Sequence, residues 1–131
     1  MQEIDEYKQV DILEFKNIAY FEYSEKTTYK IKIPDAMLKF LHLKHRSILY
    51  PIIRRNKETG LLTIFLNTDQ HTAFKNNPVH IVESGKLAIK NNDIVNINTY
   101  RTYEISIIYY QGINAYSLKL QELKEIYTKE K

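Results

Sequence analysis

The sequence predicts a β-rich α+β domain, and three observations support this fold class. Much of the chain between residues 8 and 110 alternates apolar and polar side chains with a period of two, which is typical of half-buried strands. Pro34 is followed by apolar residues at helical spacing, which predicts one short helix. Residues 114–128 carry apolar side chains at i, i+4, i+7 and i+11, which predicts a C-terminal amphipathic helix.

The composition excludes several classes of protein. The chain has 131 residues, of which 44% are hydrophobic and 27% charged, so it suits one soluble domain rather than a collagen-like, low-complexity or disordered chain. The absence of cysteine excludes disulfides, thiolate zinc sites and a cysteine nucleophile. No apolar run has the length of a membrane span, and the first residues are acidic where a signal peptide is basic. We therefore expect a soluble, cytoplasmic protein without membrane contact.

The first half of the chain predicts strands around the short helix. Residues 1–26 form an expected N-terminal β-hairpin, with strands at 8–15 and 18–24 around Lys16 and Asn17. Residues 27–33 alternate most regularly, with isoleucines on one face and lysines on the other. After the helix, which should end near Leu41, strands are expected at 47–55 and 61–66, joined by a turn that ends at Gly60.

The second half predicts another β unit and the terminal helix. The polar stretch 67–78 is the longest expected loop. A second β unit is expected over 79–110, with strands at 79–82, 94–97 and 103–110. The helix at 114–128 would serve either as a dimer element or as an ordinary helix packed on the sheet.

Charge is distributed unevenly along the chain, although the net charge is only +3. Residues 1–25 hold two basic and seven acidic side chains, whereas residues 26–57 hold nine basic side chains and one acidic. Lysine and arginine neutralise phosphates, so this segment is the candidate nucleic-acid site. Its proposed contact residues are Lys30, Lys32, Lys39, Lys44, Arg46, Arg54 and Arg55. The alternative is a solvated strand face that pairs with the acidic segment 1–25.

The segment 27–66 resembles the AbrB/MazE/SpoVT-type swapped-hairpin DNA-binding domain. The matching pattern is a strand, Ile-Pro, a helical turn, a Leu-x-Leu step, and further strands, carried by Ile31, Ile33, Pro34, Met37, Leu41, Leu43, Ile48, Leu62 and Ile64. The resemblance implies a swapped-hairpin or double-psi-like β-barrel, binding of double-stranded DNA, transcriptional regulation and a homodimer. It also places Lys30 and Lys39 where the family carries basic residues that approach DNA. This chain departs from the family at His45-Arg46-Ser47, where a Gly-Asp-like turn is usual.

A fainter second copy of the same pattern lies in residues 79–108. There the run from Leu87 to Ile94 parallels the run from Leu41 to Ile48, position by position. If the copy is real, it suggests that one chain supplies both halves of a barrel that the family builds from two chains.

Other kinds of site have less support in the sequence. His42 and His45, together with Asp69 and His71 in the long loop, could form a His/Asp metal site, but scattered surface histidines explain them better, so no metal or cofactor is expected. The 11 tyrosines could stack on nucleic-acid bases or form half-buried core. No common catalytic motif is present, so we do not expect an enzyme. The rival to DNA binding is a small protein-interaction module or inhibitor, of the kind that viruses encode, with an acidic protein partner.

Overall fold

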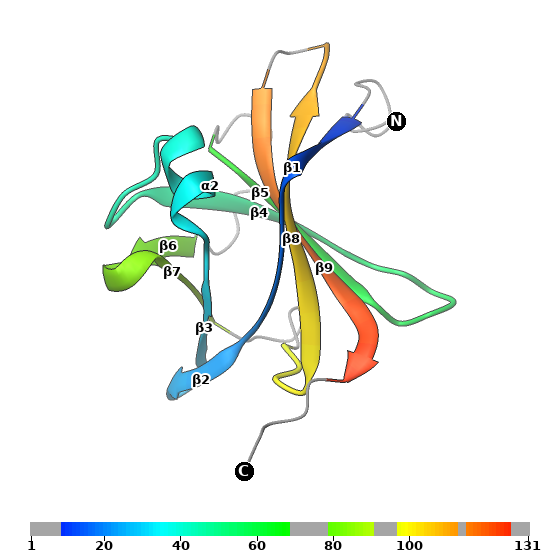
Figure 1. Ribbon diagram of the computed structural model, residues 1–131. Coiled ribbons are helices and arrows are strands. Elements are labelled where there is room, and N and C mark those ends of the chain that lie inside the picture. Colours follow the sequence, from blue (N-terminus) through cyan, green and yellow to red (C-terminus); the bar gives the residue numbers. More distant parts are fainter. Residues whose placement is uncertain (1–8, 69–78, 91–96, 113–114, 127–131) are drawn as a thin grey trace.

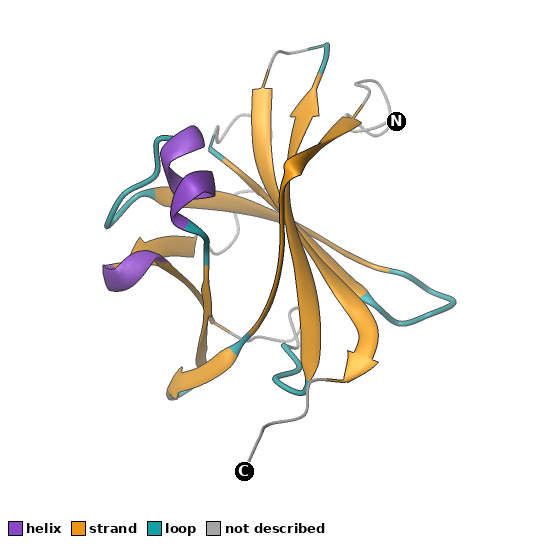
Figure 2. Cartoon of the chain, viewed as in Figure 1, coloured by secondary structure: helices purple, strands orange, loops and turns teal. Residues whose placement is uncertain are grey.

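The computed structural model describes residues 9–68, 79–90, 97–112 and 115–126, and these residues form a β-rich fold (Figure 1). Within them, nine strands, one α-helix and one 3-10 turn follow one another along the chain. They are β1 (Gln9–Tyr20), β2 (Glu22–Glu25), β3 (Thr28–Lys32), α2 (Asp35–Phe40), β4 (Ile48–Arg55), β5 (Leu62–Asn67), β6 (Val79–Val82), η1 (Glu83–Gly85), β7 (Lys86–Lys90), β8 (Arg101–Tyr110) and β9 (Ala115–Ile126). Figure 2 shows that α2 and η1 lie on the same side of an otherwise all-strand structure. The predicted β-rich fold with one short helix is confirmed.

The strands form one antiparallel sheet that is curled into a half-barrel. Its strand order is β1-β8-β9-β5-β4-β6-β7-β3-β2, so β1 and β2 lie at opposite edges. Only Phe21 separates these two strands in the chain, so the two edges of the sheet meet at this residue, which is 1% exposed. β4 joins the two halves of the sheet, because Ile48 and Leu49 pair with β6 whereas residues 50–55 pair with β5.

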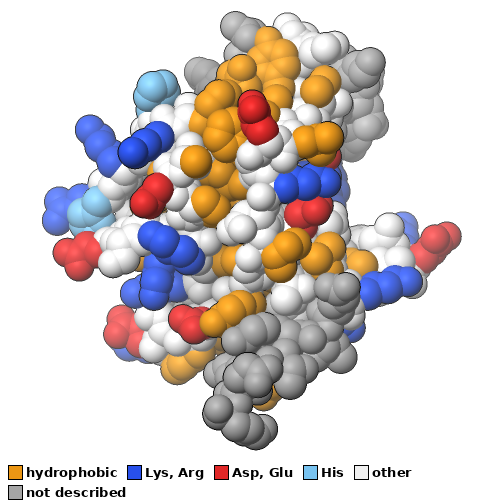
Figure 3. All heavy atoms as spheres, in the orientation of Figure 1, with side chains coloured by type: hydrophobic (Ala, Val, Ile, Leu, Met, Phe, Trp, Pro, Cys, Tyr) orange, Lys and Arg blue, Asp and Glu red, His pale blue; other side chains and the backbone are white. Residues whose placement is uncertain are grey.

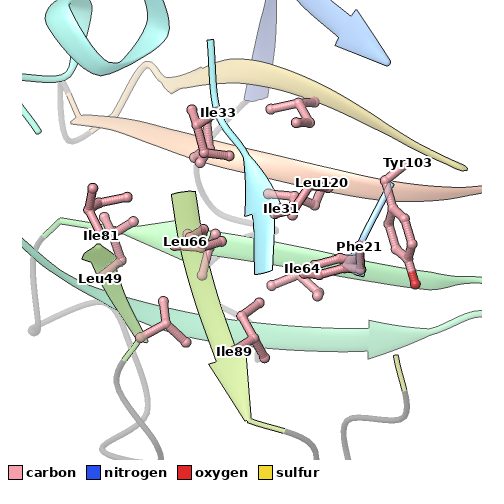
Figure 4. Packing of buried hydrophobic residues seen from close by; sticks show 14 of the residues in the cluster. Phe21, Ile31, Ile33, Leu49, Ile64, Leu66, Ile81, Ile89, Tyr103 and Leu120 are labelled. Atoms are coloured by element: carbon pink, nitrogen blue, oxygen red, sulfur yellow. The ribbon is translucent and has the colours of Figure 1, made fainter. Parts of the chain in front are cut away.

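Inward-facing side chains fill the half-barrel with one apolar core. In β3, Ile31 is buried and Lys32 is exposed, which confirms the alternation predicted for residues 27–33. The strand register aligns Ile31 with Leu87 of β7, and Leu87 with Ile81 of β6, so these three strands present one apolar row inward. Figure 4 shows the interior from close by; the core residues that it labels are Phe21, Ile31, Ile33, Leu49, Ile64, Leu66, Ile81, Ile89, Tyr103 and Leu120.

The predicted helix after Pro34 is confirmed as α2. The carbonyl of Pro34 accepts the backbone N–H groups of Met37 and Leu38, and the side chains of these two residues are buried in the core. The helix ends in a Schellman arrangement, in which the Leu43 N–H donates to the Leu38 carbonyl at 2.8 Å. His42 supplies the left-handed residue of this cap, with φ of 58°.

The predicted C-terminal helix at 114–128 is wrong, because residues 115–126 form strand β9. β9 lies between β5 and β8 and pairs with both, so it forms ladder hydrogen bonds on its two sides. Leu118, Leu120 and Glu122 alternate into the interior, a period-two pattern in which a buried glutamate takes an apolar position. The glutamate is accommodated because its Oε1 accepts the backbone N–H of Leu62 at 2.8 Å. Residues 114, 127 and 128 lie outside the described residues.

The predicted N-terminal hairpin around Lys16 and Asn17 is also wrong. β1 runs without a break through both residues and pairs with β8, with a bulge between Ile12 and Asn17 that shifts the register. The hairpin in this part of the chain instead joins β2 and β3. Residues 1–8 of the predicted unit lie outside the described residues.

The second half of the chain matches its prediction in part. The strand expected at 79–82 is β6, and the strand expected at 103–110 forms most of β8. The two copies of the suggested repeat differ in structure, because Leu41 and Leu43 follow the helix whereas Leu87 and Ile89 lie within β7. Of the loop predicted at 67–78, residues 69–78 lie outside the described part, and so do residues 91–96.

Candidate nucleic-acid interface

Two paired strands carry lysines on the outer surface of the sheet. Across β3 and β7, Lys32 is the partner of Lys86 and Thr28 is the partner of Lys90. Because the intervening apolar residues point into the core, the lysines at alternate positions point outward. The pairing therefore gathers Lys30, Lys32, Lys86 and Lys90 on one surface, although they come from segments far apart in the sequence.

A tight turn after α2 adds further cations beside these strands. The Ser47 N–H donates to the Lys44 carbonyl at 2.9 Å, and the Ser47 hydroxyl accepts the Lys44 N–H at 2.9 Å. The Arg46 N–H donates to the Ile81 carbonyl at 2.7 Å, which fixes the turn to β6. Lys44, His45 and Arg46 are all exposed. We use the name basic face for Lys30, Lys32, Lys44, Arg46, Lys86 and Lys90.

The basic face has an excess of positive charge, but it also contains carboxylates. Glu22 is the β2 partner of Lys30, Glu83 follows β6, and Asp35 lies near Lys32. Glu25 belongs to the same surface, because it pairs with Thr28, which in turn pairs with Lys90. The six cations of the basic face therefore lie beside four carboxylates of the described residues. Figure 3 shows lysine, arginine and histidine side chains gathered over the side of the molecule that carries α2, β6 and β7.

A notch of about 380 Å³ opens within the basic face. It is lined by Lys30, His45, Val82, Glu83, Ser84 and Lys86, so two ammonium groups and an imidazole surround it with one carboxylate. Lys30 and Lys86 are half-buried, whereas His45 and Glu83 are exposed. Neither lysine forms a salt bridge with a carboxylate of the described residues, where the ion pairs are Lys16–Glu104 and Lys32–Asp35.

Lys32 supports the wall of the notch instead of pointing freely into solvent. Its Nζ donates to the Ser84 carbonyl of η1 and lies 3.9 Å from Asp35 Oδ1. The neighbouring Gly85 has φ of +70°, and a Cβ added there would lie 2.8 Å from Leu38 Cδ1 and 3.1 Å from Lys32 Nζ. Glycine at this position lets η1 pack closely against both α2 and Lys32.

The structure divides the seven residues predicted to contact DNA. Lys30, Lys32, Lys44 and Arg46 share the basic face, and Lys39 is exposed in the last turn of α2. Arg54 and Arg55 end β4, at the hairpin that projects from the opposite side of the molecule (Figure 1). There the Arg55 Nη1 donates to the Gly60 carbonyl at 2.7 Å. These two arginines therefore do not share a surface with the other five residues.

Lys86 and Lys90 belong to the basic face but are not among the contact residues predicted from the sequence. The run Lys86-Leu87-Ala88-Ile89-Lys90 alternates as a half-buried strand does, and that alternation could have placed both lysines on an outer surface. The pairing with β3, which brings them to the predicted cluster, has no local signal in the sequence. His80 joins the same surface, since it pairs with Ala88, which in turn pairs with Lys30.

Some of the aromatic side chains form a contact row next to α2. The ring centroids of Phe15 and Phe40 lie 4.9 Å apart, those of Phe40 and Tyr116 lie 4.9 Å apart, and those of Tyr109 and Tyr116 lie 4.8 Å apart. Phe40 and Tyr116 remain 37% and 39% exposed. Other tyrosines belong to the core, as the alternative interpretation expected, and Tyr103 is the largest of the fully buried side chains.

Buried polar groups lie at one end of the half-barrel. Tyr103 and Glu122 are cross-strand partners, and they are 0% and 5% exposed. Burial, and to a smaller extent the Glu122 charge, raises the pKa of the Tyr103 phenol well above its ordinary value of 10.0. The Tyr103 hydroxyl has no hydrogen-bond partner among the described residues. Phe21 packs edge-on against its ring at 4.9 Å, so this end of the interior is closed by aromatic contacts.

The described residues contain no cluster of three or more His, Cys, Asp and Glu side chains that could hold a metal ion. His42 and His45 are both exposed, and Asp69 and His71 lie outside the described residues. No helix in the described part of the chain is long and apolar enough to cross a membrane.

Comparisons with models of known protein families, with curated proteins and with solved structures find no match to this chain. The geometry and charge of the basic face are therefore the basis for inferring a function.

Proposed function

We propose that the protein binds double-stranded DNA through the basic face. The observation that supports this proposal most is the register of β3 and β7, which sets four lysines side by side on one surface. Neighbouring cations on such a surface are about 5 to 7 Å apart at Cβ, both along and across the strands. A duplex carries one phosphate charge per about 1.7 Å of its axis, so closely spaced cations can neutralise several phosphates at once.

Within this proposal the residues have different roles. Lys30, Lys86 and Lys90 neutralise phosphates, because an ammonium group supplies charge without a fixed hydrogen-bonding geometry. Arg46 is exposed at the tip of the turn, where its guanidinium can reach a guanine edge as a bidentate donor. Arg54 and Arg55 lie on another side of the molecule and do not contribute to the same footprint.

The resemblance of residues 27–66 to the AbrB/MazE/SpoVT-type domain extends the proposal. It implies a non-catalytic transcriptional regulator, with a swapped-hairpin architecture and a homodimer as the DNA-binding unit. The tight turn from Lys44 to Ser47 supports the resemblance, because it lies where the family has its Gly-Asp-like turn. The mass of the protein in solution tests the homodimer directly.

Fluorescence anisotropy can test the proposal, by measuring the affinity of the protein for random-sequence duplex DNA over a range of salt concentrations. The triple variant Lys30→Gln, Lys86→Gln, Lys90→Gln should bind more weakly than the unchanged protein. Its plot of log affinity against log salt should be shallower by about 2.7, because each lost phosphate contact removes about 0.9 from the slope.

A matched variant, Lys57→Gln, Lys119→Gln, Lys124→Gln, removes the same formal charge outside the basic face. It should keep most of the affinity and of the slope. Equal losses in the two variants would show that net charge, not the basic face, causes binding. Absence of duplex binding by the unchanged protein at low salt would refute the proposal. If the protein does bind duplex DNA, a sequence-selection step separates regulatory from architectural binding.

The second candidate function is a protein-interaction module or inhibitor with an acidic protein partner. The observation that favours it is Ile48, which is 43% exposed and pairs with His80 at the border of the basic face. Apolar side chains beside cations are typical of protein interfaces, whereas DNA-binding surfaces are more polar. Replacing Ile48 with Ser should leave duplex affinity unchanged under the first proposal and weaken capture of a purified partner under the second.

A further inference from the structure

The notch in the basic face brings together cations that form no salt bridge within the described part of the chain. Lys30 and Lys86 come from adjacent strands, and His45 comes from the turn after α2. Both lysines are half-buried, so their aliphatic stems pack on the sheet while their ammonium groups remain available at the notch. Neither forms a salt bridge among the described residues, since the ion pairs there involve Lys16 and Lys32. Such a site is more stable when an anion from outside the chain enters it.

The notch has room for a phosphate group and polar side chains that can bind one. Its volume of about 380 Å³ is much larger than one phosphate group, so an anion can reach the lysines together with attached atoms. Ser84 contributes an exposed hydroxyl that can donate a further hydrogen bond. Lys32 does not compete for this anion, because its Nζ is held by the Ser84 carbonyl and lies close to Asp35.

We propose that the notch is a phosphate-binding site, in which Lys30, Lys86 and His45 surround the phosphate oxygens. The proposal rests on the proposed function, because there the phosphate belongs to the DNA backbone. A free phosphate or the phosphate of a nucleotide has the same chemistry. Glu83 lines the notch and opposes any anion, so it limits the affinity of the site and favours ligands whose other contacts compensate.

Proton NMR of the histidine C2 protons during a titration with inorganic phosphate tests the site. The chain has 4 histidines, and the His45 signal should shift and saturate. His42 lies at the end of α2 and does not line the notch, so its signal should follow only the ionic strength, as in a matched chloride titration. The proposal would be overturned if the His45 and His42 signals shift equally in the phosphate and the chloride titrations.

Two variants make the test specific to the notch. Lys30→Gln combined with Lys86→Gln should weaken phosphate binding at least about fivefold, whereas Glu83→Gln should strengthen it by about fivefold. A merely structural role for these side chains predicts no gain from Glu83→Gln. Circular dichroism shows whether each variant is folded, and the gain expected for Glu83→Gln cannot arise from unfolding.

Competition with duplex DNA identifies the source of the phosphate. If the notch binds the DNA backbone, inorganic phosphate should displace duplex more strongly than chloride at equal ionic strength, and Glu83→Gln should tighten duplex binding as well. If the His45 signal saturates but duplex does not compete, the notch binds free phosphate or nucleotides. Duplex binding without any specific response of His45 would overturn the phosphate site and leave the proposed function intact.

Discussion

Gly85 offers the sharpest test of how the notch is built. A Cβ at this position would lie 2.8 Å from Leu38 Cδ1, which belongs to a core side chain that is 9% exposed. Gly85→Ala therefore has two costs. The left-handed backbone, with φ of +70°, costs about 1 kcal/mol for an L side chain, and crowding in a packed interior adds about 1 to 3 kcal/mol. The free energy of unfolding should fall by about 2 to 4 kcal/mol.

Gly60→Ala separates these two costs. Gly60 has a similar φ of +75°, but a Cβ there would meet nothing within 4 Å. This variant should lose only the conformational part, about 1 kcal/mol. Urea denaturation followed by circular dichroism gives both free energies of unfolding. If the two variants agree to within about 0.5 kcal/mol, the close packing of η1 against α2 is not what requires glycine at position 85.

Two further predictions concern backbone strain and alkaline pH. Arg46 has φ of 77°, so Arg46→Gly should be about 1 kcal/mol more stable to urea than Arg46→Ala, while both bind duplex DNA equally weakly; the reverse order of stability would contradict a strained turn. Because the pKa of Tyr103 is raised when the protein is folded, the unfolded chain loses this proton first as the pH rises above 10.0, and stability should fall there by about 1.4 kcal/mol per pH unit for this residue. Tyr103→Phe should reduce that slope in urea titrations repeated at several alkaline pH values, and an unchanged slope would show that the phenol ionises equally in both states.

The local parts of the fold could be predicted because neighbouring residues determine them. Ile31 and Ile33 alternate with lysines, and a strand with one buried side is the structure that this pattern favours. Pro34 fixes its own φ and suits the start of a helix, so α2 was also accessible from the sequence.

The remaining parts depend on partners that are distant in the chain. Tyr116, Leu118 and Leu120 fit the strand period, whereas Tyr116, Leu120 and Leu123 fit the helical period. The two neighbouring strands of β9 decide between these structures. The candidate site shows the same limit. The positive charge of residues 26–57 predicts that Lys30 and Arg46 belong to a basic surface. Lys86 and Lys90 join that surface only because β7 pairs with β3. Arg54 and Arg55 lie far from it because they are at the other end of β4.

The position of β1 in the sheet has a consequence for the kinetics of folding. Its partner is β8, so Gln9 pairs with Tyr110 across most of the chain. During synthesis, β1 leaves the ribosome long before its partner strand β8 exists. The long stretch of chain between them must lose conformational entropy before the two strands can form their stabilising contacts. The half-barrel therefore closes late, and slow folding with a high contact order is expected. Until then the side chains of β1 that pack against the core in the folded protein, among them Ile12 and Phe15, remain uncovered, and partly folded chains can associate through them.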